Sequence, residues 1–130
     1  MKALLPPGWP RPKGYSNGMA ARGRIIVTAG VVGWDETETF RDTTLAGQFA
    51  QALRNILAIL DCDGADAARI ARLTCYVTSI DEYNASLKEI GEAWKTIIGR
   101  HYPAMALVEV VRLVEPQAKV EIEALAVVPE

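Results

Sequence analysis

The stretch TLAGQFAQALRNILAILD, residues 44–61, decides the architecture of this chain. Its large apolar residues recur at three- and four-residue spacing, which places them along one stripe of a helix: Leu45, Phe49, Leu53, Ile56, Leu57 and Leu60. Thr44 and the two residues before it offer N-cap oxygens, and Gly64 follows as a stop signal. The pattern predicts an amphipathic helix with one face in a core.

Alternating and β-branched segments on either side of this helix predict strands. Residues 72–78 alternate between apolar and polar side chains, which is typical of a half-buried strand. Residues 24–29 are apolar and β-branched, and they predict a buried strand that forms a hairpin with residues 19–22. Two further strands are expected over 104–113 and 118–127.

A second helix is predicted after the alternating strand. Ser79 and Glu82 fit a capping box, and the apolar residues that follow share one helical face up to Gly99. Residues 31–40 are expected to form a polar turn region. The proline-rich residues 1–14 are expected to form an extended arm, because proline is excluded from helix interiors and central strands.

The order β-β-α-β-α-β-β predicts a single α+β domain over residues 1–130, in which two helices cover one face of a sheet. The uncovered face must find a partner. One row of the last predicted strand is apolar, whereas the other mixes charged with apolar residues: Lys119, Glu121, Glu123, Leu125 and Val127. Such a row suits a subunit interface with a polar cleft.

Composition excludes several classes of protein. Half of the residues are hydrophobic, 23% are charged and the net charge is -2, which argues against disorder and against a nucleic-acid-binding surface. No apolar run is long enough to cross a bilayer, and no secretory leader is visible, so we expect a cytoplasmic protein. Cys62 and Cys75 lack metal-ligand spacing and His101 is the only histidine, so we expect structural cysteines and no metal.

Five segments, taken in order, carry a resemblance to a known family. They are GYSNG at 14–18, IVTAG at 26–30, Gln48 with ALRNI at 52–56, PAM at 103–105 and VEIEALA at 120–126. From residue 14 onward the chain resembles the Rid (reactive intermediate deaminase) family, also called YjgF. The resemblance implies a chorismate-mutase-like fold, a homotrimer with a central β-barrel, and small-molecule sites in the clefts between subunits.

The same resemblance implies an activity. Rid proteins of the best-known type hydrolyse reactive enamines and imines to ammonia and a 2-keto acid, and they need no cofactor. A family glutamate that orients the attacking water falls on Glu121, and two further family positions match Tyr15 and Gly30. These matches imply that Glu121 is catalytic and that Tyr15 and Gly30 contribute to substrate binding.

The chain departs from the family where the substrate carboxylate is held. The arginine of the family's Pro-Ala-Arg motif falls on Met105, a family cysteine falls on Leu107, and an asparagine falls on Gly91. A thioether cannot form a charged, two-pronged pair with a carboxylate. We therefore expect a cleft that prefers a larger or more apolar ligand, with four side chains near that ligand: Tyr15, Trp34, Met105 and Leu107. Candidates for a displaced cation are Arg24, Arg72, Arg112 and His101.

Three functions stay open at this point. The first is an enamine or imine deaminase with a non-standard substrate, and the second is a non-catalytic trimer that binds a metabolite. The third is a ribonuclease or translation inhibitor, a label often attached to the family, which the negative net charge does not favour. The plain alternatives also remain that Glu121 is a solvated residue pairing with Lys119 and that Gly30 marks a simple turn.

Overall fold

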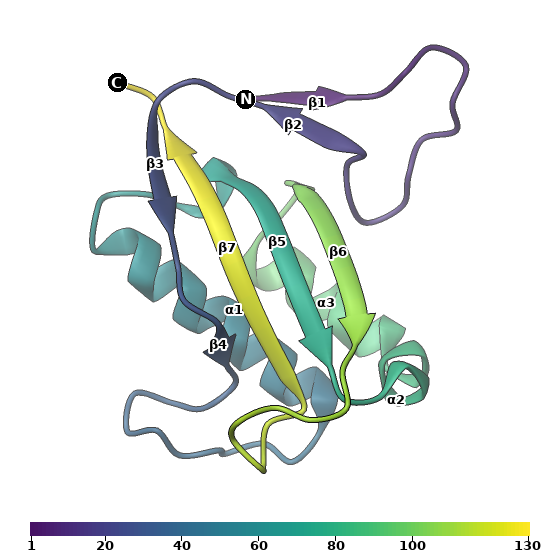
Figure 1. Ribbon diagram of the computed structural model, residues 1–130, viewed down its shortest axis with the longest axis vertical. Helices are drawn as coiled ribbons and strands as arrows, with labels where there is room; N and C mark the ends of the chain where they lie inside the picture. The colour runs from purple at the N-terminus through teal and green to yellow at the C-terminus, as the bar shows by residue number, and fades with distance from the viewer.

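The computed structural model describes residues 1–130, and it places a twisted sheet in front of a layer of helices (Figure 1). The sheet has the order β3-β7-β5-β6, and β4 also pairs with β7. Its strands are β3 (Arg24–Val27), β4 (Val31–Val32), β5 (Ile70–Val77), β6 (Ala104–Glu109) and β7 (Val120–Val128). Only the β5–β6 pair is parallel. The predicted α+β class, with helices on one face, is confirmed.

Helix α1 (Leu45–Asp61) forms where its apolar spacing predicted it. The Thr44 hydroxyl accepts a hydrogen bond from the Gly47 amide at 3.1 Å, which caps the first turn. Gly64, at φ 73°, lets the chain leave the helix in a left-handed conformation. The helix stripe is fully or nearly fully buried and packs on the sheet in one core: Leu45, Phe49, Leu53, Ile56 and Leu60.

The second predicted helix is divided in two. Ser79 caps α2 (Ile80–Ala85) by accepting a hydrogen bond from the Glu82 amide at 3.0 Å, as the sequence predicted. Ser86, at φ -109° and ψ 11°, then interrupts the helical dihedral angles before α3 (Leu87–Ile97) begins. The prediction of one continuous helix was therefore wrong. On the predicted apolar face Ile90, Trp94 and Ile98 are buried, whereas Leu87 is 52% exposed.

The N-terminal residues differ from the prediction. Instead of a wholly extended arm, β1 (Lys2–Leu4) pairs with β2 (Gly18–Ala20) in a separate two-stranded sheet. β3 does not form a hairpin with residues 19–22; it pairs with β7. Gly23, at φ 144°, turns the chain just before β3 begins. A side chain at this position would meet the Val128 carbonyl carbon at 2.7 Å. The β-branched strand thus joins the main sheet.

Residues 31–40 are not wholly a polar turn. Val31 and Val32 form β4 and are buried. The Asn55 side-chain amide donates hydrogen bonds to the Val32 carbonyl at 3.1 Å and the Trp34 carbonyl at 2.6 Å, so α1 holds this segment against the sheet. The final two strands also end differently from the prediction, at Glu109 and Val128.

One buried polar side chain ties the helix to the loop that precedes β7. Gln48 is 1% exposed, and its amide nitrogen donates to the carbonyls of Asp42 at 3.1 Å and Gln117 at 3.0 Å. Its carbonyl oxygen accepts from the Lys119 amide at 2.7 Å. These three bonds satisfy the side chain where water cannot reach it.

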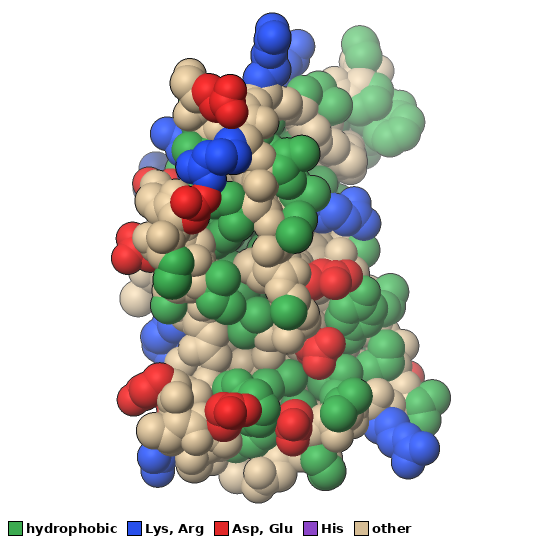
Figure 2. Space-filling model, turned by 60° about the vertical axis from the view of Figure 1, so that its left-hand side comes forward, with side chains coloured by type: hydrophobic (Ala, Val, Ile, Leu, Met, Phe, Trp, Pro, Cys, Tyr) green, Lys and Arg blue, Asp and Glu red, His purple; other side chains and the backbone are tan.

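The face of the sheet away from the helices has no cover. Ile25 and Val27 on β3 are 64% and 67% exposed, and Glu121 and Glu123 on β7 share this face with Tyr76. Hydrophobic and acidic side chains lie interspersed over the surface in Figure 2. The mixed row predicted for the last strand is confirmed, whereas the homotrimer and its barrel remain a prediction. No helix in this chain has the length and apolar character to span a membrane.

Candidate functional site

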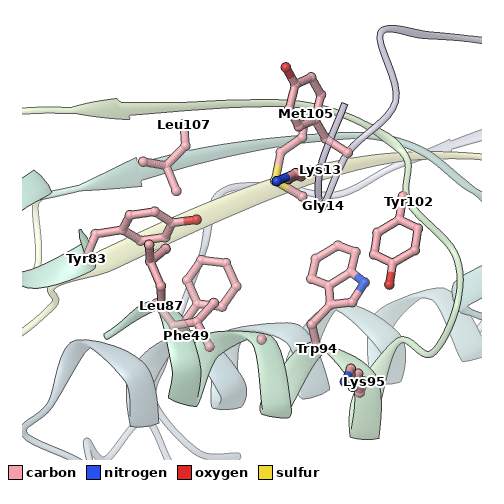
Figure 3. A pocket seen from close by; sticks show the side chains of 13 residues that line it. Lys13, Gly14, Phe49, Tyr83, Leu87, Trp94, Lys95, Tyr102, Met105 and Leu107 are labelled. Carbon is pink, nitrogen blue, oxygen red and sulfur yellow. The ribbon is translucent and has the colours of Figure 1, made fainter. Parts of the chain in front are cut away.

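A cavity of about 530 Å³ lies between β6, α3 and the segment before Ser16 (Figure 3). Nine of its 13 lining residues are hydrophobic. The lining comprises Lys13, Gly14, Tyr15, Phe49, Tyr83, Leu87, Ile90, Gly91, Trp94, Lys95, Tyr102, Met105 and Leu107. Its volume and apolar walls are typical of a small-molecule site.

Strand register places Met105 and Leu107 in this cavity. Met105 lies beside Leu73, and Leu107 lies beside Cys75, in the parallel β5–β6 pair. Neighbours in register point to the same face of a sheet, and Leu73 and Cys75 are fully buried under the helices. Met105 and Leu107 therefore face the helical layer, as Figure 3 shows.

The N-terminal segment closes one end of the cavity. Ser16 bridges to Ala104 at the start of β6, its amide donates to the Pro103 carbonyl at 3.0 Å, and its hydroxyl donates to the Tyr102 carbonyl at 2.5 Å. These contacts fix Tyr15 beside Met105 in the cavity wall. The structure thus brings Tyr15 together with two predicted site residues near the other end of the chain, Met105 and Leu107.

Aromatic side chains form much of the remaining wall. Trp94 and Tyr102 stack with ring centroids 6.3 Å apart, and Phe49 and Tyr83 lie 6.4 Å apart at a tilt. The Trp94 ring nitrogen donates to the His101 carbonyl at 3.2 Å, which fixes the indole. Burial raises the pKa of Tyr83. Trp94 belongs to the apolar face predicted for the second helix, which was expected to lie in the core; helical spacing alone does not distinguish a core residue from a cavity wall.

Glu121 and Gly30 form a second group of predicted site residues. A Cβ atom added at Gly30 would lie 2.8 Å from Cδ of Glu121, so the carboxylate packs directly on the glycine. Gly30 does not have a positive φ; its value to the site is this close approach rather than an unusual backbone conformation. Glu121 pairs in register with Tyr76, whose hydroxyl donates to Glu123 at 2.7 Å. That hydrogen bond raises the pKa of Tyr76.

The two groups lie on opposite faces of the sheet. Ile122 is buried under the helices on the face of Met105, because both are aligned through β5 with core residues. Glu121 is its neighbour in the same strand and therefore points the other way. Within one chain, the Glu121 carboxylate and the Met105 cavity are separated by the sheet.

None of the four proposed displaced cations lines the cavity. Arg24 pairs with Asp63, and the His101 ring bonds to the Ile70 carbonyl at 2.6 Å. Arg112 lines a separate depression, and Arg72 is in register with Leu125 and Ala104. The basic residues that do line the cavity are Lys13 and Lys95, which sequence reasoning did not select.

Other residues predicted near the substrate lie elsewhere or play structural parts. Trp34 packs against Phe40, with ring centroids 5.6 Å apart, and does not line the cavity. Cys75 is a buried core residue, and burial raises the pKa of its thiol to about 12. Cys62 is exposed at the C-cap of α1, where its thiol donates a hydrogen bond to the Ala58 carbonyl at 3.5 Å. No group of three His, Cys, Asp or Glu side chains is arranged around a metal site.

Comparisons with known proteins agree on one relationship. Residues 10–128 match the family described as endoribonuclease L-PSP. A 2-iminobutanoate/2-iminopropanoate deaminase from Escherichia coli is 31% identical over 105 residues, which cover 81% of this chain and 80% of the relative. The structure of YyfB, a conserved Rid protein of Yersinia pestis, has a TM-score of 0.83 at 27% identity and covers 98% of both chains. TdcF of E. coli, solved with bound serine, has a TM-score of 0.69 at 26% identity, over 98% of this chain and 99% of that one. These similarities confirm the chorismate-mutase-like fold.

Proposed function

Because this chain belongs to the Rid (YjgF) family, also described as endoribonuclease L-PSP, we propose that it is an imine and enamine deaminase with a larger, more apolar substrate than 2-iminopropanoate. The observation that carries this proposal is the Glu121 carboxylate packed on Gly30, at the family's glutamate and glycine positions. The substitution of arginine by Met105 in an aromatic-walled cavity distinguishes the substrate.

The reaction asks little of the protein. Water adds to the carbon of the C=N bond, the imine nitrogen takes up a proton, and the resulting carbinolamine expels ammonia to leave a 2-keto acid. The Glu121 carboxylate can accept a hydrogen bond from the attacking water and remove its proton. The carboxyl group then gives that proton to the imine nitrogen. It next carries the hydroxyl proton of the carbinolamine to the same nitrogen, so that the C–N bond breaks and ammonia leaves without a redox partner.

A second copy of the chain completes the proposed site. The sheet separates Glu121 and Gly30 from the Met105 cavity of the same chain, so a neighbour must present its Glu121 to that cavity. The uncovered face supplies a surface for this assembly, because Ile25 and Val27 expose apolar side chains beside the β7 carboxylates. The homotrimer with clefts between subunits, expected from the resemblance, meets this need.

The altered cavity explains the choice of substrate class. Loss of a buried, two-pronged arginine contact costs a small 2-imino acid roughly 2 to 5 kcal/mol of binding free energy. A larger apolar side chain regains affinity by burial, at about 25 cal/mol for each Å² of apolar surface. The aromatic walls formed by Phe49, Tyr83 and Trp94 offer that surface.

Turnover of a series of imines tests the proposal. 2-Imino acids are generated in place from alanine, leucine and phenylalanine by an amino-acid oxidase, and release of ammonia is followed above the uncatalysed rate. We expect faster turnover of the leucine and phenylalanine imines, and its loss in Glu121→Gln but not in the neighbouring control Glu123→Gln. A wild type that binds these ligands and never accelerates their hydrolysis would instead favour the non-catalytic binding protein.

Mixing two inactive variants tests the shared site. Gly91→Phe should block the cavity, because no atom lies within 4 Å of a Cβ at that position and the added ring has room to enter. After dissociation and random reassembly with Glu121→Gln, about one cleft in three of each mixed trimer combines an intact cavity with an intact carboxylate. Recovered activity, together with a trimer mass by light scattering, supports the shared site. Absence of recovery from reassembled trimers contradicts it.

A further inference from the structure

The cavity presents positive charge and no negative charge. Lys13 and Lys95 are its only charged lining residues. Neither lysine belongs to an ion pair; the pairs in the structure are Arg24 with Asp63, Arg41 with Asp35, and Lys119 with Glu82. An anion that enters the cavity therefore meets an ammonium group that no carboxylate already occupies.

Lys13 is an exposed residue of the cavity lining, in the segment that leads to the start of β6. The Ser16 bridge to Ala104 aligns the N-terminal segment with the start of β6, the strand that carries Met105. Gly14, at φ 80°, turns the backbone between Lys13 and Tyr15. Lys13 and Met105 both line the cavity, and their side chains overlap in the view of Figure 3.

Lys95 has a different position and a sufficient structural explanation. It lies in the last turn of α3, where a cation interacts favourably with the negative end of the helix dipole. In Figure 3 it lies beyond Trp94, on the side of the cavity away from Met105. The two lysines are therefore not equivalent toward a ligand that reaches the Met105 position.

We propose that Lys13 is the carboxylate-binding residue of this site and that the ligand is a 2-imino acid with a large apolar or aromatic side chain. This inference rests on the proposed function. The ligand carboxylate pairs with the Lys13 ammonium beside Met105, and its side chain extends toward Phe49, Tyr83 and Trp94. The Met105 thioether then contributes an apolar contact instead of a charge.

An ammonium in place of a guanidinium changes what the site selects. Arginine fixes a carboxylate in one plane through two parallel bonds, whereas lysine is a point charge on a flexible stem and tolerates several orientations. Orientation of the substrate then depends on how its side chain fits the aromatic walls. Binding affinity should therefore vary more strongly with the size of the substrate side chain than it does in a site with arginine.

Binding of phenylpyruvate, the stable keto-acid product of the phenylalanine imine, tests Lys13 without requiring turnover. Calorimetry is performed on wild type, Lys13→Met, Lys95→Met and Lys88→Met; Lys88 is an exposed lysine of α3 outside the cavity lining. We expect Lys13→Met to weaken binding about tenfold, since the lysine is exposed and the pair is partly screened. Binding should be unchanged in Lys88→Met.

A second change provides a rescue. Adding Met105→Arg to Lys13→Met should restore at least the wild-type affinity, because the guanidinium returns a cation to the same end of the cavity. Unchanged binding in Lys13→Met, a loss that falls on Lys95→Met instead, or no binding of phenylpyruvate by the wild type would each overturn the inference. Measurements of turnover distinguish a failure of the Lys13 assignment from a failure of the proposed deaminase activity. If binding depends on Lys13 but no ammonia is released, only the proposed deaminase activity is contradicted. If turnover is the same in wild type and Lys13→Met, only the assignment of Lys13 is contradicted.

Discussion

Replacing Gly30 by alanine should impair catalysis while leaving the fold intact. Gly30 has no positive φ, so alanine brings no backbone strain, but its Cβ would lie 2.8 Å from Cδ of Glu121. Carbon atoms pack at roughly 3.5 to 4.0 Å, so the carboxylate must retreat by about 1 Å. A displacement of that size at a catalytic group can cost about a hundredfold in rate, and we expect kcat to fall by that order with little change in KM.

Ammonia release from the phenylalanine imine measures this effect, and thermal unfolding checks the fold. Glu121 is only half-buried and its side chain can rotate away, so the melting temperature should change by no more than a few degrees. Gly30→Ala in a Glu121→Gln background is the matched control and should cause no further loss of rate. A Gly30→Ala protein with the wild-type kcat, or one whose loss is the same in both backgrounds, would refute the catalytic role of this carboxylate.

Three further predictions concern substrate choice, pH and packing. Met105→Arg should raise kcat/KM for 2-iminopropanoate by about two decades, measured as ammonia release, because it restores a two-pronged carboxylate contact; no gain would show that the cavity does not receive the carboxylate. Burial raises the pKa of Cys75 from 9.0 to about 12, so unfolding releases a proton only between these pH values. Between these pH values the free energy of unfolding should fall by about 1.4 kcal/mol per pH unit as pH rises. Urea titrations of Cys75→Val should lack this contribution to the fall. Gln48→Leu leaves buried backbone groups unpaired and should lower the free energy of unfolding in urea by roughly 2 to 4 kcal/mol. The exposed control Arg54→Ala on the same helix should change it by less than about 0.5 kcal/mol.

Elements with a local physical signal were predictable from the sequence. The stripe of α1 and the alternation of β5 each repeat over several residues, and each dictates which side chains are buried. The two residues of β4 give no such repeat, so they were included in a polar turn. The break at Ser86 was also missed, because a single change of dihedral angles leaves the apolar spacing almost intact.

Partners that lie far apart in the chain were not predictable by the same reasoning. β3 was assigned to its neighbour in sequence, but its partner is β7, near the other end of the chain. The family resemblance supplied Tyr15, Gly30, Met105, Leu107 and Glu121 as site residues, but not that the sheet separates them into two groups. Lys13 was overlooked because its proximity to Met105 depends on the bridge between Ser16 and Ala104.

The position of β7 has a consequence for how the protein is made. β7 is the last strand along the chain, yet it lies between β3 and β5 and is the strand that joins them. As a ribosome synthesises the chain from its N-terminus, β3 and β5 emerge with no partner between them until β7 follows. The sheet therefore cannot be completed in stages behind the ribosome, and its long-range pairings should make folding a late, slow and cooperative event.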